Sequence, residues 1–236
     1  MRPRFEELAW RSTPIGELTL RRRVEPTLGV DVYEVKLGEE FLMSSLFTVA
    51  EEELARLALA ELDEPAIDVV VGGLGLGYTA RTVLTDPRVR TVTVVELLED
   101  VIDWQQHGLL PDAALLTGDP RAHLVAGDFF ARSASAAGFD VQVPGRRFHA
   151  ILLDVDHSPR HVLDPAHARF YTEAGLRNLT RHLLPGGVFA LWSDDPPDEA
   201  FCAVARTVFS RVRSVEVTFP NFYTGSHSAN TIYLAH

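Results

Sequence analysis

Two carboxylates and a histidine follow an apolar run in the segment ILLDVDHSP, residues 151–159. An ionised carboxylate is costly to bury unless something pairs with it, so an apolar strand that ends in Asp154 and Asp156 suggests a use for their charge. A carboxylate beside a substrate can take a proton from an attacking amine or hydroxyl, and it attracts a cation. Asp154, Asp156 and His157 are therefore the candidate catalytic residues. The competing interpretation makes Asp154 a cap and Asp156 a solvent-facing loop residue.

A second group of residues has the spacing of a nucleotide-binding loop. The segment GGLGLGYTA, residues 72–80, contains a match to G-x-G-x-x-G/A, and its glycines let the backbone approach a ligand at the start of a helix. Glu96 follows about twenty residues later, where an acid can accept both hydroxyls of a ribose. Asp128 follows the next predicted strand, and an acid there suits the amino group of an adenine.

Alternating strand and helix patterns position these residues. AIDVVVGG, residues 66–73, is a continuous apolar run ending in glycine, which is typical of a parallel strand buried on both faces. Further strands are predicted at 91–96, 123–128, 149–155, 188–193, 214–219 and 231–236. Helices are predicted at 78–85, 98–106, 129–137, 168–183 and 198–212. The glycines and acids then fall at the carboxyl ends of successive strands, where doubly wound sheets bind ligands.

The predicted fold is α/β, with a doubly wound, mostly parallel seven-stranded sheet. No helix separates the last two predicted strands, so they form an antiparallel edge at the carboxyl-terminal end. Residues 1–48 form a small β-rich domain, with alternating patterns at 16–23 and 30–38 and a further strand at 41–45. A helix at 50–62 opens the ligand-binding domain, which we predict to span residues 49–236.

Bulk properties exclude several functions. The net charge of −11 disfavours binding to nucleic acid or to an anionic membrane surface. Lys36 is the only lysine, so neither a P-loop nor a Tyr-x-x-x-Lys dehydrogenase pair is present. Pro159 interrupts the loop that contains His157, so we expect no metal centre there. A single cysteine and the lack of a signal peptide or membrane-spanning run favour the cytoplasm.

The nucleoside is predicted to be S-adenosylmethionine or its decarboxylated form. The glycine fingerprint also occurs in dinucleotide-binding proteins, but nothing in the chain resembles an apparatus for hydride transfer. The antiparallel pair at the carboxyl-terminal end is foreign to that fold as well. A dehydrogenase is therefore the weaker alternative.

Four segments together resemble the spermidine synthase-like branch of class I S-adenosylmethionine-dependent transferases, in particular its poorly characterised members. They are VVVGGLGLGYTARTVLTDPRVRTVTVVELLEDVI, AGDFF, FHAILLDVDHSP and RFYTEAGLRNLTRHLLPGGVFAL, and the likeness covers roughly residues 10–236. The resemblance implies a Rossmann-like methyltransferase fold and a homodimer contact through the small β domain. It also implies roles for individual residues: Gly73, Gly75 and Gly77 line the methionine side of the cofactor, Glu96 holds the ribose, Asp128 and the backbone of Phe129 contact adenine, and Asp154 lies beside the reacting centre.

The departures from this branch bear on the reaction. Aminopropyltransferases carry GGGDG, whose acid helps to hold the aminopropyl ammonium, but this chain has Leu74 and Leu76 in its loop and no acid. They also carry D-S-x-D-P, where His157 replaces the second aspartate, and the residues that meet a polyamine are missing from residues 48–59. We therefore predict transfer of a methyl or related alkyl group to a small-molecule acceptor, with amines among the candidates. Aminopropyl transfer from the decarboxylated cofactor and a non-catalytic cofactor-binding homologue are the alternatives.

Overall fold

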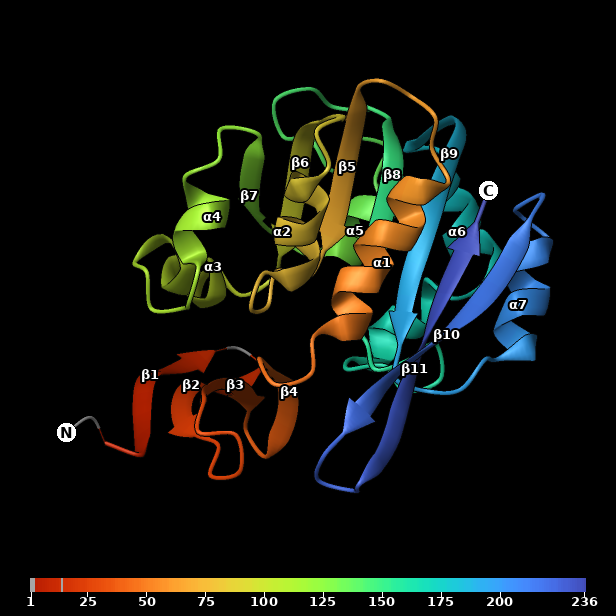
Figure 1. Cartoon of the computed structure of the whole chain (residues 1–236). Coiled ribbons are helices and arrows are strands. Elements are labelled where there is room, and N and C mark those ends of the chain that lie inside the picture. Colours follow the sequence, from red (N-terminus) through yellow and green to blue (C-terminus); the bar gives the residue numbers. More distant parts are fainter. Residues whose placement is uncertain (1–2, 14) are drawn as a thin grey trace.

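The computed structural model describes residues 3–13 and 15–236, which form two sheets and their covering helices. The first four strands pair in chain order as an antiparallel sheet, which we call the small sheet (Figure 1). They are β1 (Phe5–Thr13), β2 (Gly16–Val24), β3 (Asp31–Leu37) and β4 (Glu40–Ser44). The predicted domain boundary at residue 48 falls between β4 and the first helix.

The larger sheet has seven strands in the order β10-β11-β9-β8-β5-β6-β7. Its strands are β5 (Ile67–Gly72), β6 (Val89–Glu96), β7 (Ala122–Ala126), β8 (Phe148–Leu153), β9 (Leu183–Ser193), β10 (Val212–Asn221) and β11 (Ser226–Ala235). Strands β5 to β9 are parallel, whereas β11 runs antiparallel to β9 and to β10. This confirms the predicted doubly wound sheet with an antiparallel edge. The strand order reverses between β5 and β8, so the loops after these two strands lie side by side.

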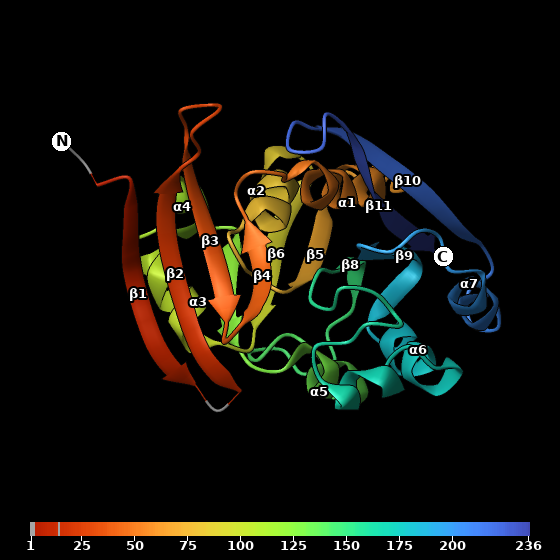
Figure 2. The same cartoon turned by 90° about the horizontal axis from the view of Figure 1, so that it is seen from below.

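Helices cover both faces of the seven-stranded sheet (Figure 2). One face packs against α1 (Val49–Ala60), α2 (Tyr78–Thr85), α3 (Glu99–Gln106) and α4 (Ala113–Thr117). The other packs against α5 (Phe129–Ala134), α6 (Glu173–Thr180) and α7 (Glu199–Arg206). Every residue of β5 is buried because the strand lies between these two helical layers. None of the helices in the described part of the chain is long and apolar enough to cross a membrane.

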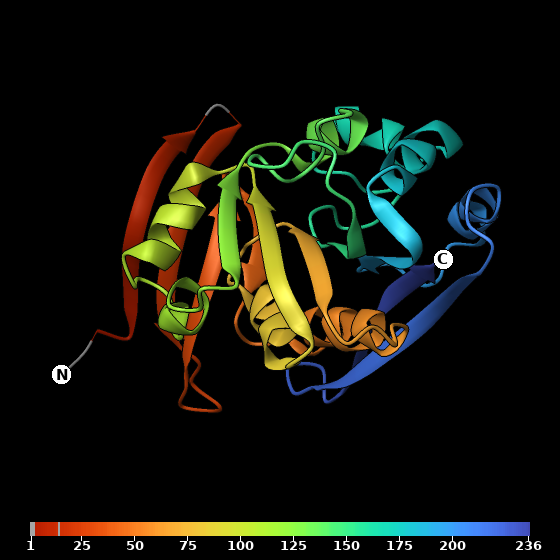
Figure 3. The same ribbon diagram turned by 90° about the horizontal axis from the view of Figure 1, so that it is seen from above.

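The small sheet lies below the carboxyl ends of the parallel strands (Figure 1), and the β10–β11 hairpin reaches it from the opposite edge of the large sheet from β7 (Figure 3). The hydroxyl of Tyr223, at the hairpin tip, donates to Glu25 at 2.7 Å and accepts from Arg23 at 3.0 Å. The ring of Phe47 packs against that of Phe222 with centroids 5.7 Å apart. The small sheet is therefore joined to the large one in two places. The chain passes from β4 into α1, and the tip of the β10–β11 hairpin contacts the small sheet.

The structure differs from the sequence prediction in the segment 168–183. The expected single helix is a short 3-10 helix η1 (Pro165–Arg169) followed by the separate helix α6. Thr172 interrupts it, because its hydroxyl accepts the N–H of Gly175 and so starts a new helix. The break leaves the side chain of Tyr171 buried beneath the loop that follows β8.

Two further elements had no counterpart in the sequence prediction. Strand β1 is exposed along most of its length, with only Ala9 buried, so it lacks the apolar alternation that predicts a strand. Helix α4 has only five residues, too few for a helical repeat to be visible.

Candidate active site

The glycine-rich loop joins β5 to α2 in a conformation that only glycine adopts easily. Gly73, Gly75 and Gly77 have φ values of 91°, 47° and 88°. A Cβ atom on Gly73 would collide with the main-chain oxygen of Asp154, and one on Gly75 would collide with the thioether of Met43. The loop is therefore held tightly between the end of β8 and strand β4 of the small sheet.

Glu96, at the end of β6, fixes the same loop. Its Oε2 accepts the backbone N–H of Leu74 at 2.9 Å, and its Oε1 accepts that of Leu98, also at 2.9 Å. Burial raises the pKa of Glu96, and these backbone N–H groups act in the opposite direction. The carboxylate thus lies directly behind the loop, although it does not line the pocket described next.

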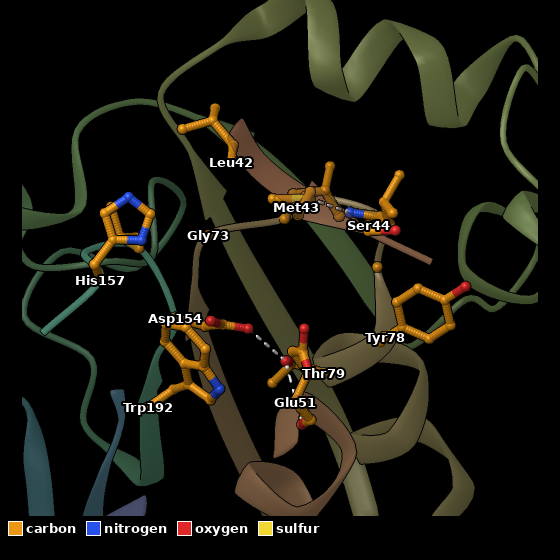
Figure 4. Close-up of a pocket in the computed structure, with 15 residues that line it drawn as sticks. Leu42, Met43, Ser44, Glu51, Gly73, Tyr78, Thr79, Asp154, His157 and Trp192 are labelled. Atoms are coloured by element: carbon orange, nitrogen blue, oxygen red, sulfur yellow. Dashed lines mark hydrogen bonds between the residues drawn. The ribbon is translucent and has the colours of Figure 1, made fainter. Parts of the chain in front are cut away.

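A pocket of about 120 Å³ opens beside the glycine loop (Figure 4). Small-ligand sites usually measure ~300 Å³ or more, so this pocket has room for the reacting end of a nucleoside ligand rather than for all of it. Five of the predicted site residues line it: Gly73, Gly75, Gly77, Asp154 and His157. The remaining lining residues come mainly from β4, α1, α2 and β9: Leu42, Met43, Ser44, Glu51, Leu74, Leu76, Tyr78, Thr79, Val155 and Trp192.

Asp154 presents its carboxylate to this pocket from the end of β8. The hydroxyl of Thr79, in the first turn of α2, donates to its Oδ2 at 2.9 Å (Figure 4). The same hydroxyl lies 3.3 Å from the main-chain oxygen of Glu51. Burial raises the pKa of Asp154 to about 6, partly offset by the bond from Thr79. A carboxylate with such a pKa is well suited to exchange protons near neutral pH.

Glu51 is a second carboxyl group in the pocket, and the sequence analysis missed it. It lies in the first turn of α1, and burial, followed by the nearby charge of Asp154, raises the pKa of Glu51 to about 8. The next two residues on the helix, Glu52 and Glu53, both pair with Arg56. Glu53 and Glu52 precede Arg56 by three and four residues, the spacing at which helical side chains pair. Glu51 precedes it by five residues and does not have this spacing, which is the one sequence signal that distinguishes it.

An indole and a thioether complete the pocket wall. The Nε1 of Trp192 is buried and has no hydrogen-bond partner among the residues that the structure describes. Met43, on β4, lies over the glycine loop, and its sulfur accepts the backbone N–H of Leu76 at 3.1 Å. The pocket thus combines two acids with apolar and aromatic surface, a combination suited to a ligand that is partly cationic.

His157 connects the loop after β8 to the small sheet. Its Nε2 lies 3.1 Å from Oε1 of Glu40 on β4, and its main-chain oxygen accepts the N–H of Asp194 at 2.7 Å. His157 thus lines the pocket while its Nε2 contacts Glu40. His157 is therefore placed to hold the small sheet over the site.

Asp156 lies outside the pocket, and its side chain is fully buried. Its Oδ1 accepts the backbone N–H of Leu163 at 2.8 Å and lies 2.8 Å from Nδ1 of His167, and its Oδ2 accepts the hydroxyl of Tyr171 at 2.7 Å. Three partners therefore surround this carboxylate within the loop that follows β8. The arrangement can shape the loop that carries His157, but it points no acid at the pocket.

Asp128 and Phe129 follow β7, at the start of α5. Asp128 caps the helix, with its Oδ1 accepting the N–H of Phe130 at 2.7 Å and that of Ala131 at 3.1 Å. The ring of Phe129 is buried in the core, so this residue can offer only its backbone to a ligand. Asp128 lines a second hollow, of about 530 Å³, between α5 and α6.

The histidines of the loop after β8 bind other side chains. His161 Nδ1 lies 2.9 Å from Oδ2 of Asp195, and His167 pairs with Asp156 as described above. Within residues 3–13 and 15–236, no group of three or more histidine, cysteine or acidic side chains is arranged to hold a metal ion.

Sequence relatives of the chain are polyamine-related enzymes. A protein from Pseudomonas aeruginosa named polyamine aminopropyltransferase 2 is 31% identical over 184 residues, which cover 72% of this chain and 47% of that protein. Putrescine N-methyltransferase 1 from Nicotiana tabacum is 28% identical over 182 residues, covering 74% of this chain and 44% of that protein. The chain thus spans about half the length of the curated relatives it matches. No family model matches it.

Solved structures share the fold at low sequence identity. Spermidine synthase from Thermotoga maritima superposes with a TM-score of 0.73 at 20% identity, covering 97% of this chain and 72% of that one. Human methyltransferase-like protein 13, solved in complex with SAH, gives a TM-score of 0.58 at 20% identity over 79% of this chain and 82% of that one. The predicted resemblance is therefore confirmed: the chain has the spermidine synthase-like form of the Rossmann-like methyltransferase fold, and over 184 residues its sequence is similar to that of a polyamine aminopropyltransferase.

Proposed function

We propose that the chain binds S-adenosylmethionine and transfers its methyl group to a small amine. The observation that carries this choice is the position of Met43. Counted from Gly72, the aspartate of GGGDG would stand at Gly75, and the thioether of Met43 fills the space that a side chain there would need. An apolar group replaces the acid that would hold an aminopropyl ammonium, which favours methyl transfer over aminopropyl transfer.

The residues present fit the intact cofactor. Gly73, Gly75 and Gly77 all line the pocket, and without side chains there the backbone of the loop can approach a ligand closely. Among the described residues, no side chain caps the first turn of α2, so its backbone N–H groups are available to a carboxylate. Only the intact cofactor has a carboxylate in addition to its ammonium. Glu96, Asp128 and the backbone of Phe129 are the proposed contacts for its ribose and adenine.

Bound S-adenosylmethionine would supply an electrophilic methyl group on a sulfonium, and the chain's own residues would position the acceptor. Asp154 accepts a proton from the attacking amine at its Oδ1, because Oδ2 already accepts the hydroxyl of Thr79. Its negative charge also stabilises positive charge nearby. The contact between His157 and Glu40 holds the small sheet against the loop that lines the pocket. We assign Asp156 a structural role in the same loop.

A parallel calorimetric titration with intact and decarboxylated S-adenosylmethionine tests the proposal. We expect the intact form to bind more tightly, and methylated product to form from S-adenosylmethionine and an amine. Failure to bind either S-adenosylmethionine or its thioether product would refute the proposal. Cofactor binding without turnover of a broad amine panel, unchanged in Asp154→Asn, would instead indicate a non-catalytic homologue.

Aminopropyl transfer is the second candidate, because Glu51 and Asp154 place two acids in the pocket and the relative at 31% identity is named an aminopropyltransferase. Tighter binding of the decarboxylated form, together with spermidine formed from putrescine, would favour this reaction. A cytoplasmic location and a homodimer contact through the small sheet remain predictions.

A further inference from the structure

We propose that Glu51 and Asp154 together bind the ammonium group of the acceptor, which makes Glu51 a specificity-determining residue for cationic amines. The inference rests on the proposed function and names the acceptor class for the same site. It concerns a residue at the start of α1, outside every motif that identifies the fold.

The geometry brings the two carboxyl groups together from distant parts of the chain. Asp154 directly follows β8, whereas Glu51 lies in the first turn of α1, and both residues line the same pocket (Figure 4). The hydroxyl of Thr79 links the two segments, 2.9 Å from Oδ2 of Asp154 and 3.3 Å from the main-chain oxygen of Glu51. It contacts the backbone of Glu51 and not the carboxyl group, and Glu51 lines the pocket together with Asp154.

Among the described residues no lysine or arginine lines this pocket, and the one histidine that does, His157, contacts Glu40. Glu52 and Glu53, by contrast, each contact Arg56 at less than 3 Å on the outer side of the helix. Two acids that share a pocket without a cation are unfavourable unless a proton or a bound cation compensates them. An ammonium group supplies that compensation, and the ring of Trp192 adds a surface that attracts cations.

Glu51 also supplies what the loop after β8 has lost. In D-S-x-D-P two aspartates are available from one loop, whereas here His157 contacts Glu40 and Asp156 is enclosed by its own loop. The loop therefore delivers one acid, Asp154, and α1 delivers the other.

Proton balance gives the inference a distinctive signature. Near neutral pH the ligand-free pair holds one proton, since burial raises the pKa of Glu51 to about 8. An amine enters as ammonium, and its charge favours the ionised form of both carboxyl groups. The proton held by the pair then passes to the buffer, so amine binding releases about one proton.

Calorimetry on the whole chain saturated with S-adenosylhomocysteine tests this inference. Putrescine and n-butylamine serve as cationic probes and 1,4-butanediol as a neutral one, in buffers of different ionisation enthalpy. We expect Glu51→Gln to weaken binding of the amines at least ~10-fold and to abolish the proton release, without affecting the diol. Glu51→Asp should restore proton release. Glu53→Gln, on the same helix but paired with Arg56, should behave as wild type.

Several outcomes would overturn the inference. They are unchanged amine affinity and proton release in Glu51→Gln, equal binding of putrescine and the diol by wild type, and no binding of either amine. Unchanged behaviour of Glu51→Gln with intact S-adenosylhomocysteine binding would overturn only the role of Glu51 and leave the proposed function standing. The other two outcomes would also count against an amine as the acceptor, but not against cofactor binding. If the wild type failed to bind S-adenosylhomocysteine, the proposed function itself would be refuted.

Discussion

Replacing Glu51 by glutamine should stabilise the ligand-free protein at alkaline pH. In the native state burial and the charge of Asp154 raise the pKa of Glu51 from 4.5 to about 8. Between these values the native state holds a proton that the unfolded chain has lost, so the free energy of unfolding falls as the pH rises. Below about 4.5 both states are protonated and the group contributes nothing. Glutamine is never ionised, so the variant loses this pH dependence.

The structure limits the size of the effect. The difference between 4.5 and about 8 corresponds to roughly 5 kcal/mol, at about 1.4 kcal/mol per pKa unit, if the carboxylate were sealed from solvent. Glu51 is only partly buried at the wall of an open pocket, so water stabilises its ionised form. We therefore expect Glu51→Gln to gain about 2 kcal/mol at pH ~9 and close to nothing at pH ~5.

Urea unfolding at several pH values between these limits measures the difference directly. Glu53→Gln is the matched control, because Glu53 pairs with Arg56 outside the pocket. It should not gain stability as the pH rises. If Glu51→Gln instead lost the same stability at acid and alkaline pH, the carboxylate would be a structural group and not a destabilised one. The reasoning about its proton would then fail.

Three further predictions, which use four substitutions, test the remaining contacts of the site. Tyr171→Phe should lower the free energy of unfolding by roughly 1.5–3 kcal/mol, because it removes one hydrogen-bond donor from the buried carboxylate of Asp156. Calorimetry should show unchanged affinity for S-adenosylhomocysteine. A loss of affinity with intact stability would contradict this. Glu96→Gln should weaken S-adenosylhomocysteine binding roughly 10- to 100-fold, because its carboxylate accepts the backbone N–H of Leu74 in the glycine loop and that of Leu98 at the start of α3. Unchanged affinity would refute that role. Gly75→Ala should lower the free energy of unfolding by ~1–2 kcal/mol in urea, because its φ is positive and its Cβ would meet Met43. Adding Met43→Ala to that variant should recover the part of the loss that comes from the collision with Met43. If the losses of the two single variants simply add in the double variant, the two side chains do not collide.

The sequence predicted the large sheet well because its strands are buried on both faces. The apolar run ending at Gly72 and the alternation of strands and helices leave little choice of topology, and the glycines and Asp154 fall at strand ends as expected. The small sheet was harder to predict, since β1 is exposed and lacks an apolar pattern. The helix break at Thr172 could not be predicted, because a threonine that caps a new helix looks in the sequence like any polar residue on an exposed helix face.

Parts of the site could not be predicted because they depend on contacts between distant elements. Glu51 faces the pocket only because α1 packs beside α2, and nothing local distinguishes it except the pairing of its neighbours with Arg56. Asp156 was also a catalytic candidate from the sequence, since it follows the same strand as Asp154. Its burial depends on Tyr171, which lies in a different segment and becomes available only because the predicted helix is interrupted.

The contact between the hairpin and the small sheet bears on the order in which the chain can fold during synthesis. The small sheet leaves the ribosome before the hairpin does, because Tyr223, which bonds Glu25 and Arg23, follows them by 198 and 200 residues. Phe47, two residues before the start of α1, packs against Phe222, which is also translated much later. The contact between the small sheet and the hairpin therefore forms late, so a nascent chain has its glycine loop well before the hairpin can pack against the small sheet.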